Sequence, residues 1–154
     1  MKQIIQQFGS GLVKVTEVPP PSLRGSGLLV LNDASLISPG TEKSTVQSAQ
    51  KNLIGKVMER PERIQKVLAA IQRDGLADTL KRVFDKLDTP SALGYSCAGI
   101  VIEVGKDADA FSVGDRVACA GQQYASHAEV VYVPKNLCVK IPDSVDSEDA
   151  SFVT

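Results

Sequence analysis

Two segments of the sequence combine glycines with hydroxyl side chains that could transfer a proton. Segment 38–42 reads Ser-Pro-Gly-Thr-Glu, and segment 94–99 reads Gly-Tyr-Ser-Cys-Ala-Gly. A phenol can donate a proton to a developing alkoxide, although an ordinary pKa of about 10 makes it a slow base at neutral pH. Tyr95 and Thr41 are therefore candidate proton-transfer groups. The structural alternatives are a ring that fills a groove for Tyr95 and a helix cap for Thr41.

Cysteine and histidine, the usual zinc ligands, are few and widely spaced. They are three cysteines and one histidine: Cys97, Cys119, Cys138 and His127. A zinc site needs ligands that converge, but the sequence contains neither a Cys-x-x-Cys nor a His-x-x-x-His spacing. We therefore expect no structural zinc. The odd number of cysteines favours free, mostly buried thiols in a reducing cytoplasm.

Glycine pairs at 9–11 and 25–27 resemble phosphate-binding loops only superficially. Each lacks the third glycine of a dinucleotide-binding fingerprint, and neither begins an expected helix. Gly94 and Gly99 are not followed by the Lys-Ser/Thr pair of a phosphate-binding loop. We interpret the two Gly-Ser-Gly segments as hairpin turns and expect no dinucleotide-binding unit within this sequence.

The overall composition is that of a globular domain. The 154 residues are 43% hydrophobic and 23% charged, and the net charge is −1. This balance argues against a nucleic-acid or membrane-surface partner. No apolar run approaches the roughly 18–20 residues of a membrane span, and the N-terminus has no signal-peptide pattern. We expect a cytoplasmic protein.

The elements that must position these groups are mainly strands. Residues 1–37 suggest a hairpin and then a longer strand at 28–37, because short apolar runs alternate with turn residues. The pattern returns after Gly99, with expected strands at 100–104, 116–119, 128–133 and 137–141. Short strands at this spacing are typical of a barrel or a sandwich.

Residues 45–90 have a different periodicity and predict an inserted αα-hairpin. Apolar residues recur there at helical spacing in two runs, 64–71 and 76–87, with Gly75 between them. From Lys51 to Asp88 there are nine Lys or Arg and six Asp or Glu, a local charge of +3. This charge fits a solvated helical face, a lid over an anionic substrate such as a phosphorylated or nucleotide-linked sugar, or a surface that binds a partner.

The C-terminal segment begins a helix. Ser147 is the expected N-cap, and Glu148 and Asp149 follow in the first turn. This helix is either a short terminal one that packs on the core or the beginning of a further domain. We favour the second interpretation, in which the chain is a piece of a longer protein.

Five segments occur in a fixed order along the chain. They read SPGTE at 38–42, GYSCAG at 94–99, VIEVG at 101–105, VGDRV at 113–117 and YASHAEV at 124–130. Together they resemble the N-terminal, GroES-like catalytic domain of the medium-chain dehydrogenase/reductase family, which includes zinc alcohol dehydrogenases and zinc-free quinone reductases. The resemblance implies a mainly β fold, a partly open GroES-like β-barrel over residues 1–154, with the αα-hairpin as an insertion similar to one in a bacterial subgroup. It also implies a Rossmann cofactor domain beyond Thr154.

The chain departs from the zinc-binding members of this family at their ligand positions. Pro39 stands where they carry a cysteine, and Tyr95-Ser96 stands where they carry His-Glu. The four-cysteine lobe that often follows the fourth segment is also missing. Proline has no ligand atom, and neutral tyrosine and serine are poor substitutes for imidazole and carboxylate. The resemblance therefore implies a member without zinc.

The resemblance also assigns roles to individual residues. Gly40, Thr41 and Ser44 match positions near the nicotinamide, where Thr41 would relay a proton and Ser44 replaces a frequent relay histidine. Tyr95 would direct its phenol into the cleft that zinc occupies elsewhere. Glu42 matches an acid behind the zinc ligands and more simply caps or pairs here.

The implied function is the substrate-binding and catalytic half of a zinc-independent, NAD(P)-dependent oxidoreductase. Its substrate would be a small alcohol or carbonyl compound, and one candidate class is an anionic sugar derivative. The longer protein would bind NAD or NADP, whereas this piece alone would bind neither and would be inactive. The alternative is a non-catalytic scaffold whose basic hairpin binds a partner. The sequence leaves the choice between NAD and NADP open, as it does homo-oligomerisation.

Overall fold

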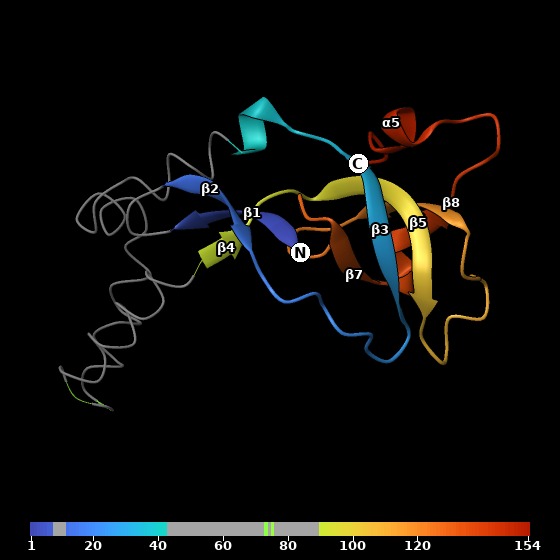
Figure 1. The fold of residues 1–154 in the computed structure, drawn as a ribbon, viewed down its shortest axis with the longest axis horizontal. Helices are drawn as coiled ribbons and strands as arrows, with labels where there is room; N and C mark the ends of the chain where they lie inside the picture. The colour runs from blue at the N-terminus through green and yellow to red at the C-terminus, as the bar shows by residue number, and fades with distance from the viewer. Residues whose placement is uncertain (8–11, 43–72, 74, 76–89) are drawn as a thin grey trace. The chain divides into compact units, whose positions relative to one another are not determined.

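The computed structural model describes residues 1–7, 12–42, 73, 75 and 90–154, and Figure 1 shows them as a coloured ribbon. The chain divides into two compact units. The first contains residues 1–5, 14–38 and 92–154, and the second contains residues 6–13 and 39–91. The expected αα-hairpin at 45–90 lies almost entirely outside the described residues, so it stays a prediction.

The first unit is built on a five-stranded antiparallel sheet (Figure 1). Its strand order is β7-β3-β5-β6-β8. The strands are β3 (Gly27–Ser35), β5 (Ser96–Val104), β6 (Arg116–Ala120), β7 (Val130–Pro134) and β8 (Cys138–Lys140). A 3-10 turn, η1 (Lys135–Leu137), joins β7 to β8. Each of the five expected strands after residue 27 is present, with ends shifted by a few residues.

Three further strands form a smaller sheet with the order β2-β1-β4. They are β1 (Lys2–Gln7), β2 (Val13–Glu17) and β4 (Pro90–Ala92). The expected hairpin near the N-terminus is therefore present. β4 begins with Pro90, which has no N–H to donate, and it lies at the edge of its sheet, where a proline is tolerated.

Alternating side chains on the five strands make the core of the first unit. One face of the sheet buries a cluster of aliphatic and cysteine side chains: Leu28, Val30, Cys97, Val101, Val117, Cys119, Val131 and Val133. Burial of each large aliphatic side chain contributes about 1.5–3 kcal/mol. Because successive residues point to opposite faces, Ala98 and Ala118 lie on the other face, where they pack with Ile141, Val145 and Ala150.

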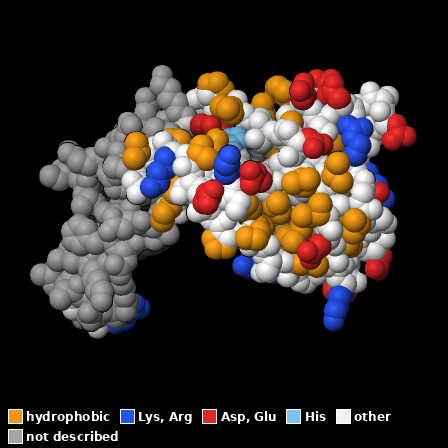
Figure 2. Space-filling model, in the orientation of Figure 1, with side chains coloured by type: hydrophobic (Ala, Val, Ile, Leu, Met, Phe, Trp, Pro, Cys, Tyr) orange, Lys and Arg blue, Asp and Glu red, His pale blue; other side chains and the backbone are white. Residues whose placement is uncertain are grey.

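The second face of this sheet is only partly covered by the described residues of its unit. Leu31 on β3 and Ile102 on β5 expose 44% and 37% of their surface. Figure 2 shows hydrophobic side chains gathered over this part of the sheet. The mainly β expectation is confirmed. Within the described residues the two sheets do not close into a barrel, because β7 and β8 remain at the edges of the larger one.

The short helix α5 (Ser147–Ala150) follows β8. The expectation that Ser147 caps it is wrong by one residue. Asp146 is the N-cap, and its carboxylate Oδ1 accepts a 2.7 Å hydrogen bond from the Asp149 N–H. The Ser147 hydroxyl instead donates to Asp33 Oδ2 at 3.1 Å. Among the described residues, no helix has the length and apolar character needed to span a membrane.

Candidate functional site

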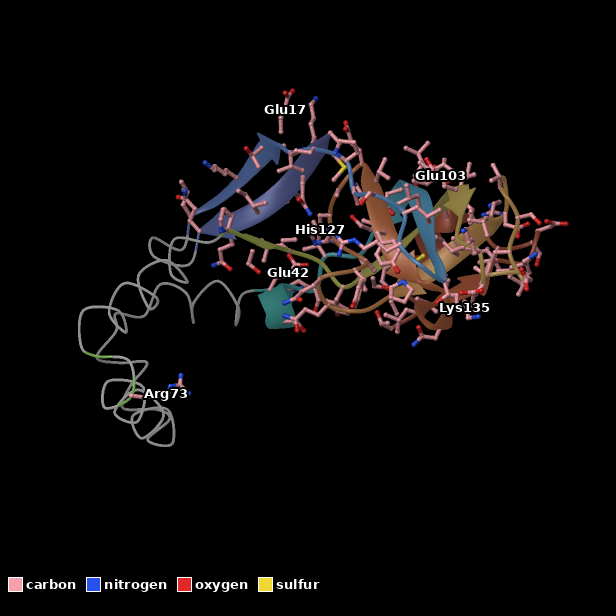
Figure 3. The ribbon with its side chains drawn as sticks, turned by 90° about the horizontal axis from the view of Figure 1, so that it is seen from below. Glu17, Glu42, Arg73, Glu103, His127 and Lys135 are labelled. Carbon is pink, nitrogen blue, oxygen red and sulfur yellow. The ribbon has the colours of Figure 1, made fainter. Side chains whose placement is uncertain are left out.

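A groove of about 300 Å³ lies in the first unit, beside the only histidine of the sequence. Three segments far apart in the sequence form its walls together with Val15: residues 2–4 of β1, residues 32–35 at the end of β3, and residues 127–129. Figure 3 labels His127 in this region. The groove therefore joins polar and titratable side chains from three separate parts of the chain.

The imidazole of His127 is held by a hydroxyl at the end of β3. Its Nδ1 lies 2.8 Å from Ser35 Oγ, and only 6% of the residue is exposed. Either atom can be the donor, because a neutral imidazole and a hydroxyl each offer one donor and one acceptor. The pair gives the groove one polar group that is positioned and nearly buried.

Three backbone hydrogen bonds form a closed ring around His127. Its N–H donates to the Leu93 carbonyl at 2.8 Å, the Leu93 N–H donates to the Ile4 carbonyl at 3.2 Å, and the Ile4 N–H donates to the His127 carbonyl at 2.8 Å. Each residue gives one hydrogen bond and accepts one. The ring fixes the backbone of His127 against the residues that lead into β5.

Gly94 allows the chain to pass close to His127. Its φ is +99°, a left-handed value that side chains rarely adopt. A Cβ at this position would lie 2.8 Å from the backbone nitrogen of His127. The first glycine of the 94–99 segment is therefore required by both backbone conformation and space.

Tyr95 follows Gly94 directly and lies at the bend before β5, with its side chain half-buried. Its carbonyl accepts a 2.8 Å hydrogen bond from the Gly121 N–H. The residues that line the His127 groove do not include Tyr95. The structure thus anchors the backbone of this candidate residue to Gly121.

Ser96 has a structural role, because its side chain binds the end of α5. It is fully buried, and its Oγ donates a 2.6 Å hydrogen bond to the carbonyl of Ser151 just after α5. The Ser151 hydroxyl donates in turn to the Glu148 carbonyl at 2.7 Å. This chain of hydrogen bonds attaches α5 to the beginning of β5.

All but the first residue of segment 38–42 belong to the second unit. Pro39, Gly40, Thr41 and Glu42 form one helical turn in which Thr41 is exposed and Glu42 is half-buried. Proline at the first helical position is favoured, because its missing N–H would have no partner there. The interpretation of Thr41 as the cap is wrong, because the helix begins two residues earlier. Ser44 lies outside the described residues.

Thr41 belongs to the second unit and Tyr95 to the first, so their joint action stays a prediction. Sequence reasoning missed the pair that the structure does bring together, Ser35 and His127. They are separated by 92 positions. The only signal was that His127 is the single histidine, which says nothing about its partner.

Pro39 and Ser96 stand at two of the positions that the family resemblance relates to the zinc site. Pro39 offers no donor atom, and the hydroxyl proton of Ser96 is committed to the Ser151 carbonyl. Within the described ranges, no group of three or more His, Cys, Asp or Glu is arranged to hold a metal ion. All three cysteines are free thiols.

A second groove of about 310 Å³ lies elsewhere in the first unit. The proline-rich stretch 18–24 and two tyrosines, Tyr124 and Tyr132, line it. The tyrosine rings lie 6.5 Å apart, and the Tyr132 hydroxyl donates to the Arg24 carbonyl at 3.0 Å. This groove contains no histidine, cysteine or carboxylate among its lining residues.

Among curated proteins, the chain is similar to oxidoreductases and to large synthases. It is 45% identical over 65 residues to a highly reducing polyketide synthase of Fusarium sp, covering 42% of this chain and 2% of that protein. It is 39% identical over 64 residues to a quinone oxidoreductase of Pseudomonas aeruginosa, covering 42% of this chain and 20% of that protein. The chain thus spans a fifth or less of the length of these two relatives.

Solved structures share the fold over nearly the whole chain. The quinone oxidoreductase of Coxiella burnetii matches with a TM-score of 0.65 and 22% identity, covering 98% of this chain and 40% of that one. The Escherichia coli quinone oxidoreductase complexed with NADPH matches with a TM-score of 0.64 and 19% identity, covering 98% and 36%. At these identities the likeness establishes the fold alone.

The family itself follows from the sequence match. Residues 64–143, just over half of the chain, match the family described as the alcohol dehydrogenase GroES-like domain. The strands that carry the last three of the five sequence segments lie inside this range. The chain therefore belongs to the alcohol dehydrogenase GroES-like domain family, the N-terminal domain of oxidoreductases of the medium-chain dehydrogenase/reductase type.

Proposed function

We propose that this chain is the substrate-binding and catalytic domain of a zinc-independent, NAD(P)-dependent oxidoreductase that interconverts an alcohol and a carbonyl compound. The observation that carries the proposal is the hydrogen bond that the Ser96 side chain makes. The family fold is kept, yet the hydroxyl at a zinc-site position is buried and donates to the Ser151 carbonyl.

Zinc independence rests on the chemistry of the donors. Zinc in proteins is held by thiolate, imidazole or carboxylate ligands. Pro39, Tyr95 and Ser96 supply none of these, and rotating the Ser96 hydroxyl away would leave the buried Ser151 carbonyl without its 2.6 Å donor. A metal at this position would have to break a hydrogen bond that attaches α5.

The cofactor proposal rests on the relatives and on the family. Two solved relatives are complexed with NADPH, one from Escherichia coli and one mycobacterial. We propose that the corresponding Rossmann domain follows Thr154 and that Gly40, Thr41 and Ser44 contact the nicotinamide end. When bound, the nicotinamide gives a hydride to a carbonyl carbon or takes one from an alcohol.

The residues of this chain then handle the proton. Without a metal, the negative charge that develops on the substrate oxygen needs a hydrogen-bond donor. We assign that role to the phenol of Tyr95, with Thr41 as the hydroxyl that relays the proton onward. A phenol is a better donor to an alkoxide than a threonine hydroxyl because it is more acidic.

His127 acts as a positioning residue in this proposal. Its backbone binds Leu93, and its ring and nitrogen lie against Gly94, so it holds the two residues immediately before Tyr95. The Ser35 hydroxyl fixes the imidazole from the other side at 2.8 Å. Disturbing this packing would move the bend that carries the phenol.

The charge of the chain and its relatives each favour one class of substrate. The positive charge of segment 51–88 favours an anionic alcohol or carbonyl compound, such as a sugar phosphate. Neutral quinones are the competing class, because quinone oxidoreductases are among the relatives.

The deciding experiment uses the longer protein in which this chain is followed by its cofactor domain. The protein is dialysed against a strong chelator and assayed with NADH and NADPH on matched panels of quinones, aldehydes, ketones and sugar phosphates. We expect turnover that is unchanged by the chelator and is not increased by added zinc. Loss of turnover with the chelator and its return with zinc would contradict zinc independence. No turnover on any panel, with folding intact, would favour the non-catalytic scaffold.

A further inference from the structure

The three cysteines of the chain occupy three neighbouring strands. Cys97 is on β5, Cys119 on β6 and Cys138 on β8, and the register pairs Cys97 with Cys119 and Cys119 with Cys138. All three are free, and the sulfurs of Cys119 and Cys138 lie 3.7 Å apart. The three cysteines thus form one row of thiols across the sheet, although 22 and then 19 positions separate them in the sequence.

The hydrogen-bond pattern distinguishes the two pairs. The Ile141 N–H donates to the Arg116 carbonyl, so these two residues are a hydrogen-bonded pair of the β6–β8 ladder. Such pairs alternate with non-hydrogen-bonded ones along an antiparallel ladder, which makes Cys119–Cys138 a non-hydrogen-bonded pair. In these pairs the Cβ atoms approach more closely, toward the roughly 3.5–4.5 Å that a disulfide requires.

The other pair falls in the opposite class. The Gly121 N–H donates to the Tyr95 carbonyl on the β5–β6 ladder. Tyr95 and Gly121 are therefore a hydrogen-bonded pair. Cys97 and Cys119 lie two positions along the ladder from them, so they are a hydrogen-bonded pair as well, with more widely separated Cβ atoms. Sheet geometry therefore favours a bond from Cys119 to Cys138 over one to Cys97.

Exposure favours the same pair. Cys97 and Cys119 are fully buried, whereas Cys138 is half-buried at the edge strand β8. A small oxidant can therefore reach the row only at its Cys138 end. The first oxidised sulfur would already be in contact with the thiol of Cys119.

We propose that Cys119 and Cys138 are a two-electron oxidation site that closes to a disulfide with hydrogen peroxide and reopens with a small dithiol. The Cys138 thiolate attacks one peroxide oxygen, the O–O bond breaks, and the released hydroxide takes up a proton. The Cys119 thiolate then attacks the sulfur of the resulting sulfenic acid and displaces a second hydroxide, which is also protonated. In total, two thiols lose two hydrogens and one peroxide becomes two waters.

The protonation state of the two thiols sets the rate at which they are oxidised. At Cys119, the hydrogen bond with Cys138 favours the thiolate, but the contact with Cys97 and burial outweigh it and raise the pKa of this thiol. The hydrogen bond with Cys119, followed by burial, raises the pKa of Cys138. Thiolate is the reactive form, so oxidation is slow at neutral pH and faster at alkaline pH.

The test is a peptide map of the 154-residue chain after peroxide treatment at neutral and alkaline pH. Trypsin cuts after Lys86, Lys106, Arg116, Lys135 and Lys140, which places the three cysteines on three separate peptides. After the peroxide treatment, we expect the intact chain to have lost two hydrogens. The thiols that are still free are then blocked before digestion, so that no disulfide forms or exchanges during the mapping. The Cys119 peptide should be linked to the Cys138 peptide, faster at alkaline pH, and dithiothreitol should release it.

Two variants sharpen the assignment. Cys97→Ala should keep the cross-link, because it leaves the proposed pair intact, and Cys138→Ser at the more exposed position should abolish it. A Cys97–Cys119 link, a bond between two chains, or no loss of hydrogen at either pH would overturn the proposal. If a variant does not fold, the wild-type peptide map alone decides, and the result is independent of the proposed oxidoreductase activity.

Discussion

The hydroxyl of Tyr95 can be removed without removing the ring that carries it. In the longer protein, Tyr95→Phe should lower turnover by roughly 10²–10⁴, the range for loss of a general acid. The free energy of unfolding should change by less than about 1 kcal/mol, because Tyr95 is only half-buried and a hydroxyl open to water contributes little net hydrogen-bond energy. Turnover and thermal melting are followed together on one preparation.

The two readouts separate the alternatives for this residue. A variant that melts far below wild type but keeps its turnover would identify Tyr95 as a packing residue. If neither quantity changes, the proton must come from Thr41 or from residues beyond this chain. Thr41→Val keeps the side-chain shape without the hydroxyl and tests that second route.

Gly94 offers a prediction with a matched control. Gly94→Ala and Gly114→Ala both place a Cβ on left-handed backbone, at φ +99° and +94°. Only at Gly94 does that Cβ meet neighbouring backbone, while at Gly114 nothing lies within 4 Å. We expect Gly114→Ala to lower the free energy of unfolding by roughly 1–2 kcal/mol and Gly94→Ala to lower it clearly further. Urea denaturation measures both, and equal losses would mean that the approach to His127 is not tight.

Between elements, one ion pair attaches the turn before β6 to β8. Asp115 Oδ2 lies 2.8 Å from Lys140 Nζ and accepts a 2.7 Å hydrogen bond from the Ser112 N–H. The hydrogen bond from Lys140, then the one from Ser112, lowers the pKa of Asp115 below its ordinary value. A carboxyl whose pKa is lowered on folding stabilises the fold above its ordinary pKa, and this stabilisation is lost as the pH falls through the folded-state pKa.

The consequence is a pH-dependent effect of Asp115→Asn. The variant should be less stable than wild type at neutral pH, by a small amount that added salt reduces, because the pair is partly exposed. The difference should begin to shrink as the pH falls below about 4, the ordinary pKa of the unfolded carboxyl, and should vanish only at still lower pH, where the folded carboxyl is protonated as well. Asp143→Asn, which removes an exposed carboxylate from the turn before α5, controls for net charge. A stability difference that stays constant from neutral to acidic pH would contradict this account.

The strands were predictable from the sequence because burial of one face imposes a period of two. β5 nevertheless begins at Ser96, earlier than expected, since the small residues Ser96–Gly99 show no alternation and are buried by pairing with β6. The Ser35–His127 pair and the row of cysteines were not predictable. Both depend on strand register between distant segments, which no local spacing encodes.

At the scale of the longer protein that we propose, this chain would bind the substrate and a separate domain would bind the cofactor. The chain covers about two fifths of the solved relatives, and its own sequence has no dinucleotide-binding fingerprint. Calorimetry should therefore detect no micromolar binding of NADH or NADPH to the 154-residue chain, and clear binding to the longer protein. Micromolar binding to this chain alone would show that the cofactor site has been misplaced.

The ring of hydrogen bonds through Ile4, Leu93 and His127 also bears on how the chain folds. Its three members are separated by 89 and 34 positions, so the ring cannot close until both long intervening segments have been brought together. Loop-closure entropy opposes such contacts early, whereas the β5–β6 ladder joins residues much nearer in the chain. The candidate site would then be assembled among the last events of folding, and a chain still growing from its N-terminus would lack that site until the segment around His127 had emerged.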